Sequence, residues 1–154
     1  MKSVGKLANF FEQELKTNLK DLIIPYPNNR YELFGRFRIE SQDQLFVITD
    51  SKTKQLIRLS SLKNAVLYCT LASVGKHMES RRIENLDLKL MSLQVDMAIH
   101  KKMLKSAVDD DAKFIYINKL QEAAYRKKIL NAEVTGYINS SKRILEFKLS
   151  QNFN

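Results

Sequence analysis

The sequence predicts an α+β fold: an N-terminal helix, a three-stranded antiparallel β-meander, a second helix and a long antiparallel helical hairpin. Apolar residues recur three and four positions apart over residues 3–22 and again from residue 62 onward, which is helical spacing. Between these stretches, residues 31–60 are rich in β-branched and aromatic residues and carry short polar turns. Parallel strands would need longer crossover connections, so we expect an antiparallel sheet.

The first helix is expected over residues 3–22, with Ser3 as its N-cap. Pro25 and Pro27 end this helix and predict a loop. Three strands follow over residues 31–40, 44–50 and about 55–60, and the turns between them are short enough for hairpins. The apolar stripe of the first helix consists of Val4, Leu7, Phe11, Leu15, Leu19 and Leu22.

The second helix is expected over about residues 62–78, capped by Ser60 or Ser61. A long helix then runs from about residue 79 to 108, and aspartates 109–111 mark its break from a further helix toward residue 149, which Gly136 weakens. A short turn makes these two long helices antiparallel. We therefore divide the chain into an α-β-β-β-α module, residues 1–78, and a hairpin, residues 79–154, within one structural unit.

The long helix carries a ladder of residues on one stripe, a pattern typical of a helix that packs along a partner helix. Its polar member, His100, is of the kind that sets register or partner choice. We expect this ladder to be the interaction seam of the protein, within the chain or between chains. It consists of Ile83, Leu86, Leu90, Leu93, Met97, His100 and Leu104.

The composition limits the compartment and the partners. The single cysteine, Cys69, excludes an internal disulfide and favours a reducing compartment, and its apolar surroundings predict a buried thiol. The longest apolar run, residues 65–74, is too short to span a bilayer, so we expect a soluble cytoplasmic protein. A net charge of +9 favours a polyanionic partner such as DNA or RNA.

No motif predicts catalysis, a cofactor or a metal ion. Aspartates 109–111 lack the spacing of a calcium loop and suit the start of a helix. His77 and His100 have no neighbouring ligand pattern, and the four glycines are scattered singly, so no phosphate loop is present. We expect no enzyme, no cofactor, no metal and no small-molecule substrate, with an enzyme of unrecognised motif as a distant third hypothesis.

The leading hypothesis is a non-enzymatic assembly module that contacts itself or another protein through the hairpin. The alternative is a nucleic-acid-binding protein, in which one sheet face mixes Phe34, Phe46 and Ile48 with arginines, subject to strand register. That face could instead be covered by the long helices. The candidate nucleic-acid contacts are Phe34, Arg36, Arg38, Arg58, Arg81, Arg82, Lys89, Arg126, Lys127 and Lys128.

Two resemblances accompany these residues. The element order over residues 3–78 resembles the double-stranded RNA-binding domain, a likeness of topology that carries no residues over. The stretches 31–37 (YELFGRF) and 60–66 (SSLKNAV) are similar to uncharacterised small proteins of marine tailed bacteriophages. That resemblance implies a host-cytoplasm or virion setting and assigns no function.

Overall fold

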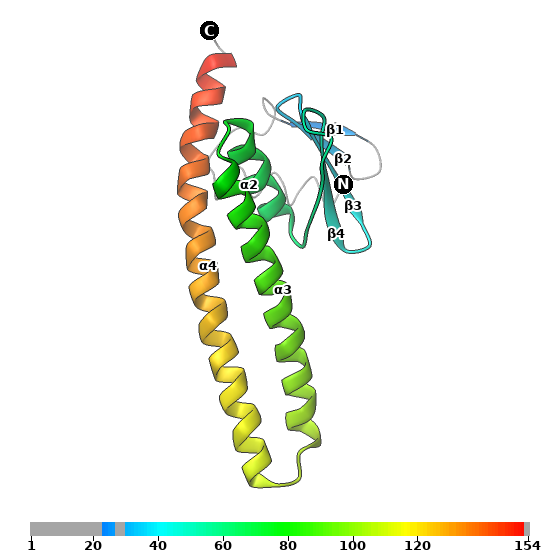
Figure 1. Ribbon diagram of the computed structural model, residues 1–154, viewed down its shortest axis with the longest axis vertical. Coiled ribbons are helices and arrows are strands. Elements are labelled where there is room, and N and C mark those ends of the chain that lie inside the picture. Colours follow the sequence, from blue (N-terminus) through cyan, green and yellow to red (C-terminus); the bar gives the residue numbers. More distant parts are fainter. Residues whose placement is uncertain (1–22, 27–29, 153–154) are drawn as a thin grey trace.

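The computed structural model describes residues 23–26 and 30–152, and its α+β architecture is a small antiparallel sheet followed by three helices (Figure 1). Within the described residues five strands form one sheet in the order β1-β2-β3-β4-β5. The strands are β1 Ile23–Tyr26, β2 Arg30–Leu33, β3 Phe37–Gln42, β4 Leu45–Asp50 and β5 Leu56–Leu59, and the helices are α2 Leu62–Ser73, α3 His77–Ser106 and α4 Asp110–Asn152.

The α+β class and the antiparallel meander are confirmed, but the strand expected over residues 31–40 is two strands. β2 and β3 pair antiparallel through a tight turn, in which the Arg36 N–H donates to the Leu33 carbonyl at 3.1 Å. Phe34 and Gly35 have φ values of 58° and 64°, the backbone of the turn type that suits strand twist in hairpins.

The N-terminal part of the prediction is only partly tested. The helix expected over residues 3–22 lies outside the described residues. The loop expected around Pro25 is wrong at that position, because residues 23–26 form strand β1, which pairs with β2 at the edge of the sheet. An edge strand tolerates proline because one side of its backbone needs no ladder partner.

Helix α2 lies between the sheet and the hairpin, and ten of its twelve residues are buried. It begins where expected, since the Ser61 hydroxyl caps it by accepting from the Asn64 N–H at 3.1 Å. It ends earlier than expected, at Ser73, and Gly75 takes a φ of +79° just beyond it. Cys69 is fully buried as expected, and this burial raises the pKa of its thiol.

The core joins one face of the sheet to α2 and to the near end of the hairpin. The register sets Leu33 opposite Phe37, and Ile39 between Tyr31 and Ile48, all on the buried face. The hairpin contributes Ile83, Leu86, Val134, Ile138 and Leu145 to the same core. The sheet, α2 and the hairpin therefore share one core.

Two buried carboxylates hold these parts together. Asp50, at 4% exposure, accepts from the Arg36 guanidinium twice at 2.8 Å, and this pairing holds the Asp50 pKa well below its usual range. Asp87 of α3, at 0% exposure, accepts from the Ser60 N–H at 2.9 Å, the Ser60 hydroxyl at 2.7 Å and the Asn64 amide at 2.8 Å. Asp87 thus fixes the start of α2 to the hairpin.

The hairpin is formed by α3, 30 residues long, and α4, 43 residues long (Figure 1). Asp109 precedes α4, and its carboxylate accepts from the Asp111 N–H at 3.2 Å, which fits the expected capping role of these aspartates. Gly136 does not break α4. Beyond the core, the two helices extend together as a projecting arm.

Candidate interaction surface on the helical hairpin

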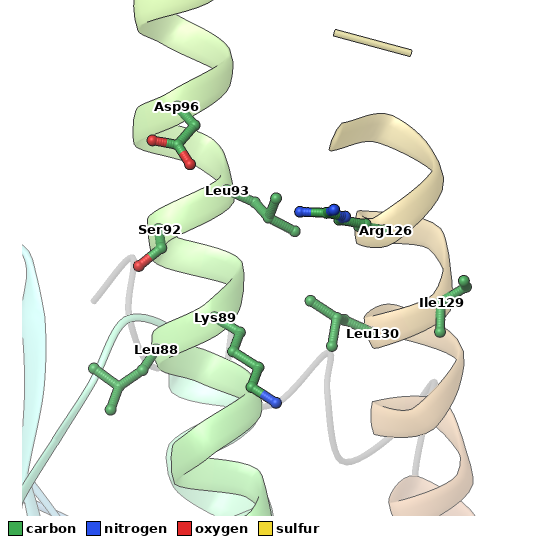
Figure 2. A pocket seen from close by; sticks show the side chains of 8 residues that line it. All are labelled: Leu88, Lys89, Ser92, Leu93, Asp96, Arg126, Ile129 and Leu130. Carbon is green, nitrogen blue, oxygen red and sulfur yellow. The ribbon is translucent and has the colours of Figure 1, made fainter. Parts of the chain in front are cut away.

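The ladder of α3 lies toward α4 within the chain. Ile83 and Leu86 are fully buried, and the remaining members, Leu90, Leu93, Met97, His100 and Leu104, are half-buried. Along the arm, the His100 ring lies edge-on to the Tyr116 ring with 6.1 Å between centroids. The side chain of Leu93 points across to α4, where Leu130 points back (Figure 2). α4 therefore accompanies the ladder inside a single chain.

A second set of apolar residues faces away from this contact and was not singled out by the sequence analysis. Their exposed fractions lie between 42% and 67%. Exposed apolar residues gathered on one arm are typical of a surface that contacts another molecule. The set is Leu88, Val95, Ile99 and Met103 on α3, and Phe114, Ile115, Ile117, Tyr125 and Ile129 on α4.

An open groove of about 480 Å³ lies between the two helices on one side of the arm (Figure 2). Leu93 and Leu130 form its apolar floor. Lys89 and Arg126 stand on either side of it, one from each helix. The full lining is Leu88, Lys89, Ser92, Leu93, Asp96, Arg126, Ile129 and Leu130. We call this side of the hairpin the groove side.

The groove side is turned away from α2. Residues two apart on a helix point about 200° from one another. Asp87 is held against Ser60 and Asn64 at the start of α2, so Lys89 points to the other side of α3. Within the part of the chain that the structure describes, α2 therefore leaves the groove side uncovered.

Charges of both signs lie along the groove side. Arg82 of α3 donates to Glu133 of α4 at 2.5 and 2.9 Å, and this hydrogen bonding lowers the Glu133 pKa. Farther along the arm, five exposed charged residues on this side have no ion-pair partner within 4 Å in the described part of the chain. They are Lys89 and Asp96 on α3, and Lys119, Glu122 and Arg126 on α4, and the Lys119 amine lies 5.8 Å from the centre of the Tyr116 ring.

The opposite side of the hairpin is basic and polar. A cavity of about 220 Å³ lies there beside the start of α2, between Lys63 and Lys127. Its other lining residues are Ser60, Ser61, Asn64, Leu90, Gln94, Asn131 and Val134. No carboxylate lines this cavity, although the buried Asp87 contacts Ser60 and Asn64 behind it.

The sheet does not bring together the mixed aromatic and arginine face on which the nucleic-acid-binding alternative depended. Ile48 is fully buried and Phe46 packs against the core, because their register puts them on the face that meets α2. The Arg36 guanidinium forms an ion pair with Asp50 and also donates a hydrogen bond to the Ala72 carbonyl at 3.3 Å. Phe34 lies in the β2–β3 turn, where the Lys148 amine is 4.8 Å from its ring centre.

The remaining candidate nucleic-acid contacts are spread over several surfaces. Arg38 and Arg58 are exposed on the outer face of the sheet, with β4 between them. Arg38 also lies 3.9 Å from a Glu40 carboxylate oxygen. On the helices, Arg81 and Lys128 are exposed, Arg82 pairs with Glu133, Lys89 and Arg126 line the groove, and Lys127 lines the smaller cavity.

No group of three or more histidine, cysteine, aspartate or glutamate side chains in residues 23–26 and 30–152 is placed to hold a metal ion. Over the same residues, no helix combines the length and hydropathy that crossing a membrane requires. Comparisons with protein families, with curated proteins and with solved structures each gave no match.

Proposed function

We propose that this protein is a non-enzymatic assembly module, and that the groove side of its helical hairpin is the surface that binds another protein. The observation that supports this is the apolar surface left exposed on the arm after α3 and α4 have packed together. Leu88 and Ile129, one on each side of the groove, are 53% and 52% exposed. Large apolar side chains on opposite rims of an open groove favour a protein partner.

The charge distribution supports the same choice of side. Three positive and two negative side chains lie together on the groove side of a chain whose net charge is +9: Lys89, Lys119, Arg126, Asp96 and Glu122. A surface of mixed sign suits a protein partner, whereas a polyanion is favoured by a surface of one sign.

The test is site-specific photo-crosslinking with the full chain. A photoreactive residue at Ile129 probes the groove side, and one at Asn131 is the matched control, since it points about 200° away on the same helix. We expect protein adducts from position 129, identified by mass spectrometry, at several times the yield from position 131. Adducts from position 131 alone, or none from position 129, would contradict the proposal.

A second candidate function, nucleic-acid binding, is favoured by the basic side of the hairpin. Lys63 and Lys127 converge on one cavity there with no ion-pair partner within 4 Å among the described residues. If these lysines bind phosphates, affinity for DNA or RNA should fall steeply with salt, and Lys127→Glu should lower it further. An absence of retention at low salt would exclude this function.

A further inference from the structure

We propose that the smaller cavity, beside the start of α2, binds one phosphodiester group of a nucleic-acid strand, and that the strand continues from there along the basic side of the hairpin toward its tip. This inference rests on the second candidate function and deepens it, because it names the group that is held and the path of the strand. It does not depend on the groove side.

The cavity has the size of a subsite for one chemical group. Its volume of about 220 Å³ is below the roughly 300–1,000 Å³ of pockets that enclose a whole small-molecule ligand. Three lining side chains, Ser61, Gln94 and Asn131, have donors that form no hydrogen bond within the described part of the chain. Such hydroxyls and amides commonly donate to phosphate oxygens. One phosphate group therefore suits the cavity better than a complete nucleotide.

The charges around the cavity match a phosphodiester better than a phosphomonoester. Lys63 of α2 and Lys127 of α4 line the cavity and are half-buried. One negative charge lies close by, the buried Asp87 carboxylate behind Ser60 and Asn64. These three groups leave one positive charge, which the single negative charge of a phosphodiester neutralises. A phosphomonoester carries about −1.5 to −2 at pH 7 and would leave an excess of negative charge.

Three further lysines lie on the same side of the hairpin, farther toward its tip. Residues 18 positions apart on a helix point in the same direction, so Lys113 is in line with Asn131 on α4. On α3, Lys101 and Lys105 follow Gln94 by seven and eleven positions, which keeps each within about 20° of its direction. All three lysines are exposed. The basic side therefore continues beyond the cavity.

No carboxylate interrupts this path between the cavity and the turn at residues 109–111. The acidic residues of the two helices over that stretch are Asp96 and Glu122, which lie on the groove side. The Arg82–Glu133 pair sets Lys127 level with about residue 88 of α3, so Lys101 lies about 20 Å farther along the arm. About six nucleotides of a strand with a rise of about 3.4 Å span that distance. A surface of one sign over such a length favours a polyanion.

The experiment measures binding of a strand of about 20 nucleotides, as DNA and as RNA, to the full chain by fluorescence anisotropy over a salt series. Lys127→Ala should weaken binding and lower the slope of log affinity against log salt by about 0.7, the contribution of one phosphate contact. Lys89→Ala is the matched control, because it removes the same charge from the groove side and should leave the slope unchanged. Lys101→Ala combined with Lys105→Ala tests the path and should lower the slope by up to about 1.4. Circular dichroism checks that each variant folds.

Failure of this inference can be told apart from failure of nucleic-acid binding. A strand that binds with an unchanged slope in Lys127→Ala, or with an equal loss in Lys89→Ala, would overturn the cavity as the site and leave the function standing. An unchanged slope in the double variant would overturn the path along the arm. An absence of retention of both strands at low salt would contradict the function itself. Binding to vesicles of anionic phospholipid alone, lost in Lys127→Ala, would replace the strand by a lipid head group.

Discussion

Replacing Asp87 with alanine tests whether the hairpin and the α-β module are held together by the hydrogen bonds at the start of α2. The carboxylate is fully buried and accepts three hydrogen bonds, two from Ser60 and one from Asn64, at 2.7 to 2.9 Å. A hydrogen bond to a charged group contributes about 1.5–3 kcal/mol, and part of that gain is offset by the cost of burying the charge.

Removing the carboxylate leaves donors on both residues without their acceptor. Ser60 is half-buried, so water can satisfy its groups in part, but Asn64 is only 6% exposed and its amide loses its partner. We therefore expect Asp87→Ala to lower the free energy of unfolding by about 3 kcal/mol, and Asp87→Asn by about half as much, since the asparagine carbonyl still accepts.

The assay is urea unfolding followed by far-ultraviolet circular dichroism at one low protein concentration, so that association does not contribute. Glu146→Ala is the control, because this carboxylate is exposed on α4 and its loss should change stability by less than about 0.5 kcal/mol. A loss below about 1 kcal/mol for Asp87→Ala would refute the reasoning, since the cost of burying the charge would then cancel its hydrogen bonds.

Three further predictions concern single groups. Because its arginine partner lowers the Asp50 pKa, the stability this pair contributes should be complete above about pH 5 and be lost as the pH falls below about 4, seen as a declining melting temperature. Gly75→Ala should cost about 1 kcal/mol because φ is +79° there, whereas Gly136→Ala inside α4 should add about 0.5–1 kcal/mol, both measured by urea unfolding; an equal sign for the two would contradict this. The pKa of the Glu133 carboxyl, followed by NMR, should lie below its usual range and should rise toward that range in Arg82→Gln. An unchanged pKa in this variant would show that Arg82 is not the cause.

The α+β class, the start of α2 and the two long helices could be predicted because each depends on local spacing and capping. The single strand expected over residues 31–40 was wrong for a physical reason. The turn at Phe34 and Gly35 returns the chain with Phe37 opposite Leu33, on the same face, so the alternation of apolar residues continues through it unchanged. Phe-Gly also lacks the Asn or Asp that usually marks such a turn.

The ladder on α3 could be found because it was the strongest single stripe, but the groove side could not. Leu88 and Ile99 recur at helical spacing, yet only the alignment of α3 with α4 places Leu88 across the groove from Ile129. Nor could the sequence show that Arg36 forms an ion pair with Asp50. The two residues are 14 positions apart and are brought together by the pairing of β3 with β4.

The solitary thiol at position 69 gives the molecule a built-in reporter. Cys69 is fully enclosed in α2 and its burial disfavours the reactive thiolate, so a thiol reagent can modify it only after that helix leaves the sheet. The rate at which the reagent modifies Cys69 in native buffer would therefore report how often α2 separates from the sheet. Fraying at the tip of the arm would not contribute to this rate.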